Sequence, residues 1–237
     1  MAREKIFRFK QFHVHNHLSA MKVGTDGVLL GAWADVSDAK RVLDIGAGTG
    51  LISLMVAQRS NAEAVAVEID ADAAKEATMN FDESPWRDRL QVVNKDFIEY
   101  VDTCTEKFDV IISNPPYFIN SLESPDDKRT KARHTGTLSF EQLICGAEML
   151  LSRSGHIYLI TPSDAETVID KIVEVRGLYV VGKTYVIPVV GAEPKRILWD
   201  ITRSKSDIII DSITIEIARH IYTDKYIDLT RDFYINM

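Results

Sequence analysis

The stretch V-L-D-I-G-A-G-T-G, residues Val42–Gly50, decides the fold that this sequence predicts. The apolar run Arg41–Ile45 is typical of a buried strand, and Thr49–Arg59 has the apolar spacing of a helix. Three glycines between them let the backbone turn tightly and approach a ligand closely. A dinucleotide-binding fingerprint reads G-x-G-x-x-G, whereas here the third glycine comes one residue early and an acid, Asp44, ends the strand. A carboxylate at that point suits a cationic or amine-bearing ligand better than a pyrophosphate.

Short β-branched runs alternate with helical patterns along the middle of the chain, which predicts a parallel sheet with crossover helices. Two long runs joined by the turn-rich G-A-E-P-K, Tyr179–Val189 and Arg196–Thr202, predict an antiparallel hairpin that closes an edge of the sheet. We therefore expect an α/β, Rossmann-like fold with a seven-stranded, mostly parallel sheet and a C-terminal antiparallel hairpin. The other predicted strands are Glu63–Glu68, Leu90–Asn94, Phe108–Ser113, Gly155–Ile160 and Ile208–Ile217, and the other helices are Ala71–Phe81, Phe140–Leu151 and Ala165–Val175.

Length and composition suit one soluble domain, because 237 residues are 46% hydrophobic and 27% charged. Within it we expect an N-terminal segment (1–40), a catalytic core (41–204) and a C-terminal extension (205–237). No apolar run has the length of a signal peptide or a membrane span, and the two cysteines have no metal or redox spacing, which favours a cytoplasmic protein. The net charge of −7 argues weakly against nucleic-acid binding but leaves room for a local basic patch. We expect a monomer or a weak dimer.

Two more acids stand at the ends of predicted strands: Glu68 ends the second strand and Asp96 closes the third. With Asp44 they stand at the carboxyl ends of three successive strands, which face one crevice in this topology. Glu68 there can accept both hydroxyls of a ribose, and Asp96 can accept the amine of an adenine whose ring lies against Ile69 or Phe97. Each acid alone would also serve as a helix N-cap. S-adenosylmethionine fits the set because it carries an adenosine, a sulfonium and an amino group.

At this point the sequence resembles the class I S-adenosylmethionine-dependent methyltransferases, over roughly residues 20–175. The resemblance implies that the second-strand acid holds the ribose and the third-strand acid meets the adenine. It also implies that the glycine loop holds the methionine moiety, through Gly46, Ala47, Gly48 and Gly50.

After the fourth strand comes S-N-P-P-Y, which contains Asn114, Pro115, Pro116 and Tyr117. In isolation it is a proline turn that ends a strand. At the tip of the central strand, however, the Asn114 side-chain oxygen and the Pro115 carbonyl can accept both hydrogens of a planar amine, with no strong base. Holding the nucleophile in line with the methyl group then supplies most of the catalysis, while Tyr117 stacks on the base and Asn114 also borders the cofactor. The motif matches the N-P-P-[YF] signature of amino-methyltransferases.

The segment M-K-V-G-T-D-G-V-L-L-G-A-W (Met21–Trp33) resembles the lead segment of the bacterial tRNA(Val) adenine N6-methyltransferases. Residues 124–134 and the closing R-D-F-Y-I-N-M resemble the same family. This resemblance implies N6-methylation of the adenosine next to the tRNA anticodon, position 37, with Lys22, Thr25 and Asp26 as extra cofactor contacts. Without it, the segment predicts a glycine turn before a helix Val28–Trp33 that Asp26 would cap.

Three alternatives stay open. A guanine N2 or a glutamine-amide methyltransferase shares the tetrapeptide, although the glutamine enzymes that modify release factors usually carry a helical domain ahead of the glycine motif. A non-catalytic RNA-binding module would keep the fold without the chemistry. A dehydrogenase is disfavoured by the glycine spacing.

Cations gather in three places that could contact RNA phosphates, although a charge run is usually a solvated surface. Phe7, Phe9 and Phe12 could stack on splayed bases. His13, His15 and His17 alternate, but no Cys or acid nearby completes a ligand set, so we expect no metal. The predicted RNA contacts are Arg8, Lys10, Lys128, Arg129, Lys131, Arg133, His134, Lys195 and Arg196.

Overall fold

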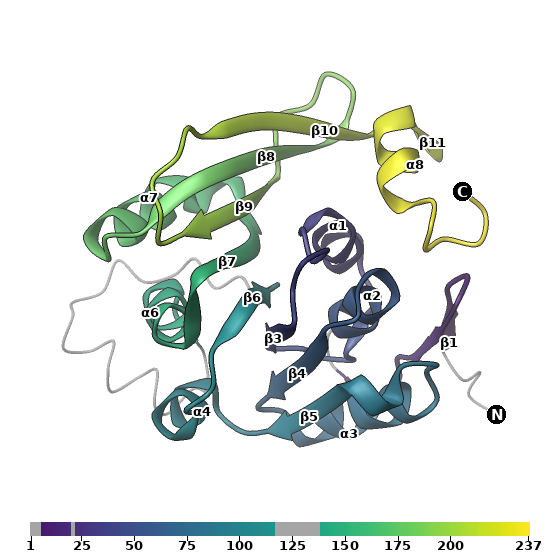
Figure 1. Cartoon of the computed structure of the whole chain (residues 1–237). Coiled ribbons are helices and arrows are strands. Elements are labelled where there is room, and N and C mark those ends of the chain that lie inside the picture. Colours follow the sequence, from purple (N-terminus) through teal and green to yellow (C-terminus); the bar gives the residue numbers. More distant parts are fainter. Residues whose placement is uncertain (1–5, 20–21, 117–137) are drawn as a thin grey trace.

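The computed structural model describes residues 6–19, 22–116 and 138–237. Its main feature is a twisted sheet with the strand order β11-β10-β8-β9-β7-β6-β3-β4-β5 (Figure 1). The strands are β3 (Arg41–Ile45), β4 (Glu63–Glu68), β5 (Leu90–Asn94), β6 (Phe108–Ser113), β7 (Leu151–Pro162), β8 (Tyr179–Val189), β9 (Arg196–Thr202), β10 (Ile209–Ala218) and β11 (Ile221–Tyr222). A separate antiparallel ribbon joins β1 (Ile6–Arg8) to β2 (His13–His15).

The α/β class with a mostly parallel sheet is confirmed, but two details of the prediction are wrong. The sheet has nine strands among the described residues, not seven. The predicted hairpin, β8 with β9, does form, yet it lies inside the sheet because β10 pairs in parallel with β8 along its outer side. The weakly patterned C-terminal extension thus continues the sheet and supplies its edge.

Helices cover both faces of the sheet. On one face lie α1 (Thr25–Trp33), α2 (Leu51–Arg59) and α3 (Ala71–Asp82); on the other lie α4 (Phe97–Thr103), α6 (Phe140–Leu150) and α7 (Glu166–Val175). The central strands are buried on both sides, so they carry unbroken apolar runs rather than an alternating pattern. A last helix, α8 (Asp224–Thr230), packs against α1 and β10.

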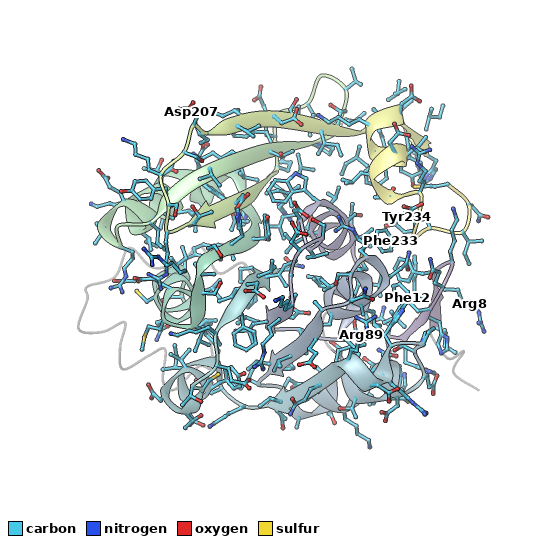
Figure 2. All side chains as sticks on the ribbon, viewed as in Figure 1. Arg8, Phe12, Arg89, Asp207, Phe233 and Tyr234 are labelled. Carbon is cyan, nitrogen blue, oxygen red and sulfur yellow. The ribbon has the colours of Figure 1, made fainter. Side chains whose placement is uncertain are left out.

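The N-terminal ribbon and the C-terminal segment close over one side of the molecule, where Figure 2 labels Phe12, Phe233 and Tyr234 close together. Phe9 forms a bridge with Tyr234, and the Lys10 N–H donates to the Phe233 carbonyl at 2.8 Å. Phe9 and Phe12 are 4% and 6% exposed and stack at a ring separation of 4.6 Å. The prediction that both stack on RNA bases is therefore wrong, because both rings are core residues, whereas Phe7 is 37% exposed.

The order of the strands places a switch point at β3. The chain runs from β3 outward through β4 to β5, and then returns to β6 on the other side of β3. In open parallel sheets, ligands bind in the crevice beyond the carboxyl ends of the strands at such a point. The described part of the chain contains no helix that is long and apolar enough to cross a membrane. The division into segments 1–40, 41–204 and 205–237 stays a prediction.

Candidate active site

The glycine loop follows β3 at the switch point. Gly46, Gly48 and Gly50 all adopt the left-handed region, with φ of 70°, 56° and 79°. The Gly46 N–H donates to the Val67 carbonyl at 2.8 Å, which fixes the loop against the end of β4. A Cβ on Gly50 would lie 2.5 Å from the Phe81 ring, whereas a Cβ on Gly46 would meet no described atom within 4 Å. At Gly50 the loop therefore packs tightly against α3, whereas at Gly46 the described residues leave the space that a bound ligand requires.

Asp44 lies beneath this loop, fully buried. Its Oδ2 accepts from the Ser53 hydroxyl at 2.7 Å and from the Ser53 N–H at 3.2 Å, in the first turn of α2. Its Oδ1 is buried and has no hydrogen-bond donor among the described residues. Burial outweighs the Ser53 hydrogen bonds and raises the pKa of Asp44 to about 7. An orphan acceptor of this kind suits a cationic ligand, because the carboxylate gains most from a nearby positive charge.

The buried Asp44 makes stability depend on pH. Asp44 holds its proton more tightly in the folded protein than in the unfolded chain, so the folded state carries an extra proton between pH 3.8 and about 7. The free energy of unfolding should then fall as the pH rises through that range, by roughly 2–4 kcal/mol from this group. Asp44→Asn keeps the acceptor for Ser53 and cannot ionise. Urea unfolding at a series of pH values should show the variant gaining stability relative to wild type toward pH 7; parallel curves would contradict the assignment.

Glu68 ends β4 beside the loop and is 8% exposed. Its two oxygens take different partners: Oε2 accepts from the Gly48 N–H at 2.8 Å, and Oε1 from the Asp70 N–H at 2.9 Å. Asn94 donates to the Glu68 carbonyl at 2.8 Å and steadies the same strand end. The carboxylate therefore shapes the glycine loop, and its remaining lone pairs can accept from a ligand.

The third acid is placed differently. Asp96 caps α4, and its Oδ1 accepts from the Ile98 and Glu99 N–H groups at 2.8 and 3.2 Å. Phe97 is 5% exposed and packs against Gly146 in the core, while Ile69 is 50% exposed. Of the two side chains predicted to flank an adenine ring, only Ile69 is open to a ligand. The cofactor role of Asp96 stays a prediction.

The start of the N-P-P-Y motif lies at the same edge as the glycine loop. Ile45 of β3 and Ser113 of β6 are register partners, and the Ser113 hydroxyl donates to the Ile45 carbonyl at 2.7 Å. Gly46 follows Ile45 and Asn114 follows Ser113, so both residues leave the sheet side by side. Neighbouring strands lie about 4.8 Å apart. Asn114 is half-buried, Pro115 buried and Pro116 exposed; Tyr117 lies outside the described residues. The two proposed acceptors of a planar amine, on Asn114 and Pro115, therefore follow β6 at this edge of the sheet.

The K-V-G-T-D-G segment leads into α1, which begins at Thr25 and has Gly24 as its N-cap. Asp26 does not cap this helix; it lies in the first turn and pairs with Arg196 Nε at 2.8 Å. Lys22 is exposed and donates to the Ser19 carbonyl at 2.6 Å. Because Arg196 begins β9 opposite Pro162, at the carboxyl end of β7, this pair lies at the same edge of the sheet as the glycine loop.

The structure brings three of the predicted RNA contacts into one groove, which we call the C-terminal groove. Arg8, Lys195 and Arg196 line this cavity of about 880 Å³. Lys10 is instead tied to the Arg231 carbonyl at 2.5 Å. Lys128, Arg129, Lys131, Arg133 and His134 lie outside the described residues. The other groove residues include Phe7, Thr25, Asp26, Tyr222, Tyr226 and Tyr234.

Sequence reasoning missed two polar residues that organise the site. Glu76 is fully buried and accepts from the His17, Leu18 and Ser19 N–H groups at 2.6–2.9 Å. Burial would raise the pKa of Glu76, but these donors outweigh it and hold the pKa below its usual value. Asn80 donates to the Thr49 carbonyl, inside the glycine motif, at 2.9 Å. Their spacing of four residues on the inner face of α3 was the available signal.

Comparisons with known proteins agree with this geometry. The chain matches the family Methyltransferase small domain over residues 17–184. A tRNA1(Val) (adenine(37)-N6)-methyltransferase of Phocaeicola vulgatus is 48% identical over 231 residues, covering 98% of each chain. One of Bacteroides fragilis is 47% identical over 235 residues, covering 99% of each.

Solved structures share the fold at low identity. A predicted O-methyltransferase from Agrobacterium tumefaciens has a TM-score of 0.69 at 24% identity, covering 88% of this chain and 96% of its own. A ribosomal protein L11 methylase from Lactobacillus delbrueckii subsp. bulgaricus has a TM-score of 0.55 at 15% identity, covering 76% and 78%. The fold is that of the class I methyltransferases, and the chain carries a methyltransferase domain. More specifically, it belongs to the tRNA1(Val) (adenine(37)-N6)-methyltransferase family, as the resemblance of its lead segment implied.

Proposed function

We propose that this protein transfers a methyl group from S-adenosylmethionine to the N6 amine of adenosine 37 in tRNA(Val). The observation that carries the proposal is the register of Ile45 with Ser113, which sets Asn114 beside the glycine loop in a chain of this family. A guanine N2 or glutamine-amide substrate would use the same acceptors. The two relatives, however, are named as adenine methyltransferases, and this chain matches them over almost their full length.

The residues present fit the cofactor. Among the described residues, no atom lies within 4 Å of a Cβ built on Gly46, and the buried Oδ1 of Asp44 has no hydrogen-bond donor. Glu68 keeps lone pairs beside the loop that a ligand can use. When bound, S-adenosylmethionine supplies a methyl group already activated by its sulfonium. We assign Gly46, Ala47, Gly48 and Gly50 to the methionine moiety and Glu68 to the ribose; Ile69, Asp96 and the segment with Lys22, Thr25 and Asp26 complete the predicted contacts.

The protein's own residues contribute to the reaction by positioning the amine of the substrate base. The Asn114 side-chain oxygen and the Pro115 carbonyl accept the two amine hydrogens and turn the nitrogen lone pair toward the methyl group. An amine on an aromatic ring is a poor nucleophile, so this alignment contributes more than a base would. An adenine of the anticodon loop reaches the site at less cost than a base in a duplex, because no base pair has to be broken.

The test is to incubate the purified protein with total tRNA and a labelled methyl donor, and to locate the label by nucleoside mass spectrometry and sequencing. We expect N6-methyladenosine at position 37 of tRNA(Val). Label in N2-methylguanosine or in protein would overturn the substrate, and the absence of any cofactor binding in calorimetry would favour the non-catalytic module.

We also propose that the C-terminal groove contacts the tRNA backbone. Lys195 and Arg8 are exposed in this groove, where Phe7 and Tyr222 offer rings for a base. Lys195→Glu should raise KM for tRNA about tenfold and lower the slope of log affinity against log salt by about 1, without changing S-adenosylmethionine affinity. Lys171→Glu, an equal charge change on an exposed residue of α7, is the control. Equal KM values for the two variants would rule out this contact.

A further inference from the structure

Two histidines of the N-terminal ribbon meet one glutamate of α3 outside the active site. His13 Nε2 lies 2.7 Å and His15 Nε2 2.9 Å from the same atom, Glu83 Oε2. The two rings lie on one face of β2, as residues two apart in a strand do, with centroids 5.3 Å apart. The sequence showed no acid near these histidines because Glu83 follows them by 68 and 70 residues. The fold supplies the missing ligand.

The backbone around this trio is already fixed. Asn80 accepts from the His15 N–H at 2.7 Å and donates to the His15 carbonyl at 3.1 Å. One helical turn earlier, Glu76 binds the N–H groups that follow His15. Glu76, Asn80 and Glu83 therefore form a polar stripe on one face of α3 and its C-cap, running beside the ribbon. Only side-chain rotation is needed for the three residues to change partners.

We propose that His13, His15 and Glu83 form a binding site for a divalent transition-metal ion of the Zn²⁺ type. Their three donor atoms lie within 4.8 Å of one another. Two imidazole nitrogens and a carboxylate oxygen are ligands that Zn²⁺, Co²⁺ and Ni²⁺ share, whereas Mg²⁺ and Ca²⁺ prefer oxygen alone. The side chains are 30%, 12% and 44% exposed, so water can complete the coordination.

Two of the three donor–donor distances are close to those that a metal needs, and the third, between the two imidazole nitrogens, is no more than 4.8 Å and would have to shorten by up to about 1.5 Å. Metal–ligand distances of about 2.0–2.1 Å in a tetrahedron separate neighbouring ligand atoms by roughly 3.3 Å. The observed separations of 2.7 and 2.9 Å would have to widen by about half an ångström, which rotation of the partly exposed side chains allows.

A bound ion would tie the ribbon to α3, and through Asn80 to the glycine motif. It would act as a structural clamp on the segment that leads to Lys22, and it takes no part in methyl transfer. The inference is therefore independent of the proposed substrate.

The experiment uses the full chain without a histidine tag, freed of metal with EDTA, and titrates Zn²⁺ by calorimetry at about pH 7.5. We expect one site per chain and a rise in Tm on adding Zn²⁺. Mutation of a residue that only hydrogen-bonds to a metal ligand typically lowers metal affinity about 10–100-fold. Replacement of a ligand itself should cost more, so we expect Zn²⁺ affinity to fall about 100-fold or more in each of His13→Ala, His15→Ala and Glu83→Gln. The visible spectrum of the Co²⁺ form reports the coordination geometry.

His156→Ala is the matched control, because His156 also contacts a carboxylate, Asp200, at 2.7 Å, but with a single imidazole. It should bind Zn²⁺ as wild type does. Wild-type protein that takes up no Zn²⁺, or His13→Ala and His15→Ala variants that bind it unchanged, would reduce the trio to a hydrogen-bonded cluster and overturn the proposal. Glu83→Gln keeps the size of the side chain and a hydrogen-bonding oxygen, so it reports on metal binding even where an alanine variant unfolds.

Discussion

Asn114→Ala should lower kcat for tRNA methylation by about 10³-fold while leaving the Kd for S-adenosylmethionine within about twofold of wild type. The side chain is half-buried at the end of β6, next to the glycine loop, and its oxygen is one of the two acceptors that we propose for the amine. Its removal leaves the methyl group in place but lets the nitrogen lone pair turn away. Single-turnover kinetics with saturating tRNA, combined with calorimetry for the cofactor, measure the two quantities separately.

Two further variants sharpen this result. Asn114→Asp keeps an oxygen acceptor at the same reach, so activity should rank wild type, then Asp, then Ala. Asn61→Ala replaces an exposed asparagine in the loop before β4 and should behave as wild type. An Asn114→Ala enzyme with normal turnover would remove the residue from the reaction and leave the Pro115 carbonyl as the acceptor to examine.

Local patterns predicted the fold around the glycine loop because each element there is specified by its own residues. Val42–Gly50 predicts a strand, then a turn that only glycine adopts easily, then the start of a helix. The positive φ values of Gly46, Gly48 and Gly50 confirm the turn. The outer half of the sheet was less predictable. β10 pairs in parallel with β8, and a parallel pairing between segments distant along the chain leaves no turn signature to find. The strand itself was predicted, but its place beyond the hairpin was not.

The candidate site divides in the same way. Asp44, Glu68 and Asn114 were predicted because strand ends in this topology share an edge. The partners of these residues were not, because they come from tertiary packing: Ser53 below Asp44, Arg196 on Asp26, and Glu83 on the ribbon histidines. Phe9 and Phe12 show the same limit. The sequence pattern alone does not distinguish an exposed aromatic side chain that can stack on a base from a buried one. Phe9 is buried because it packs against Tyr234, which lies near the other end of the chain.

Glu68→Ala should raise the Kd for S-adenosylmethionine by about 100-fold, equivalent to about 2.7 kcal/mol, because it removes two kinds of support at once. The ribose would lose its proposed acceptor, and the Gly48 and Asp70 N–H groups lose the carboxylate oxygens to which they donate. Calorimetry of the tRNA-free protein measures the affinity, and thermal unfolding shows whether the variant is folded. Glu63→Ala is the matched control, since Glu63 is exposed at the opposite end of the same strand.

Glu68→Gln separates the charge from the geometry. Each carboxylate oxygen accepts from a different backbone N–H, so the amide would set its own NH₂ donor against one of those N–H groups. We therefore expect the Gln variant to bind S-adenosylmethionine almost as poorly as the Ala variant, although it differs from wild type by a single group of the same size. Full affinity in Glu68→Gln would show that one acceptor suffices and that the loop keeps its shape without Glu68. In that case Asp44 and the loop amides would have to account for the cofactor's affinity.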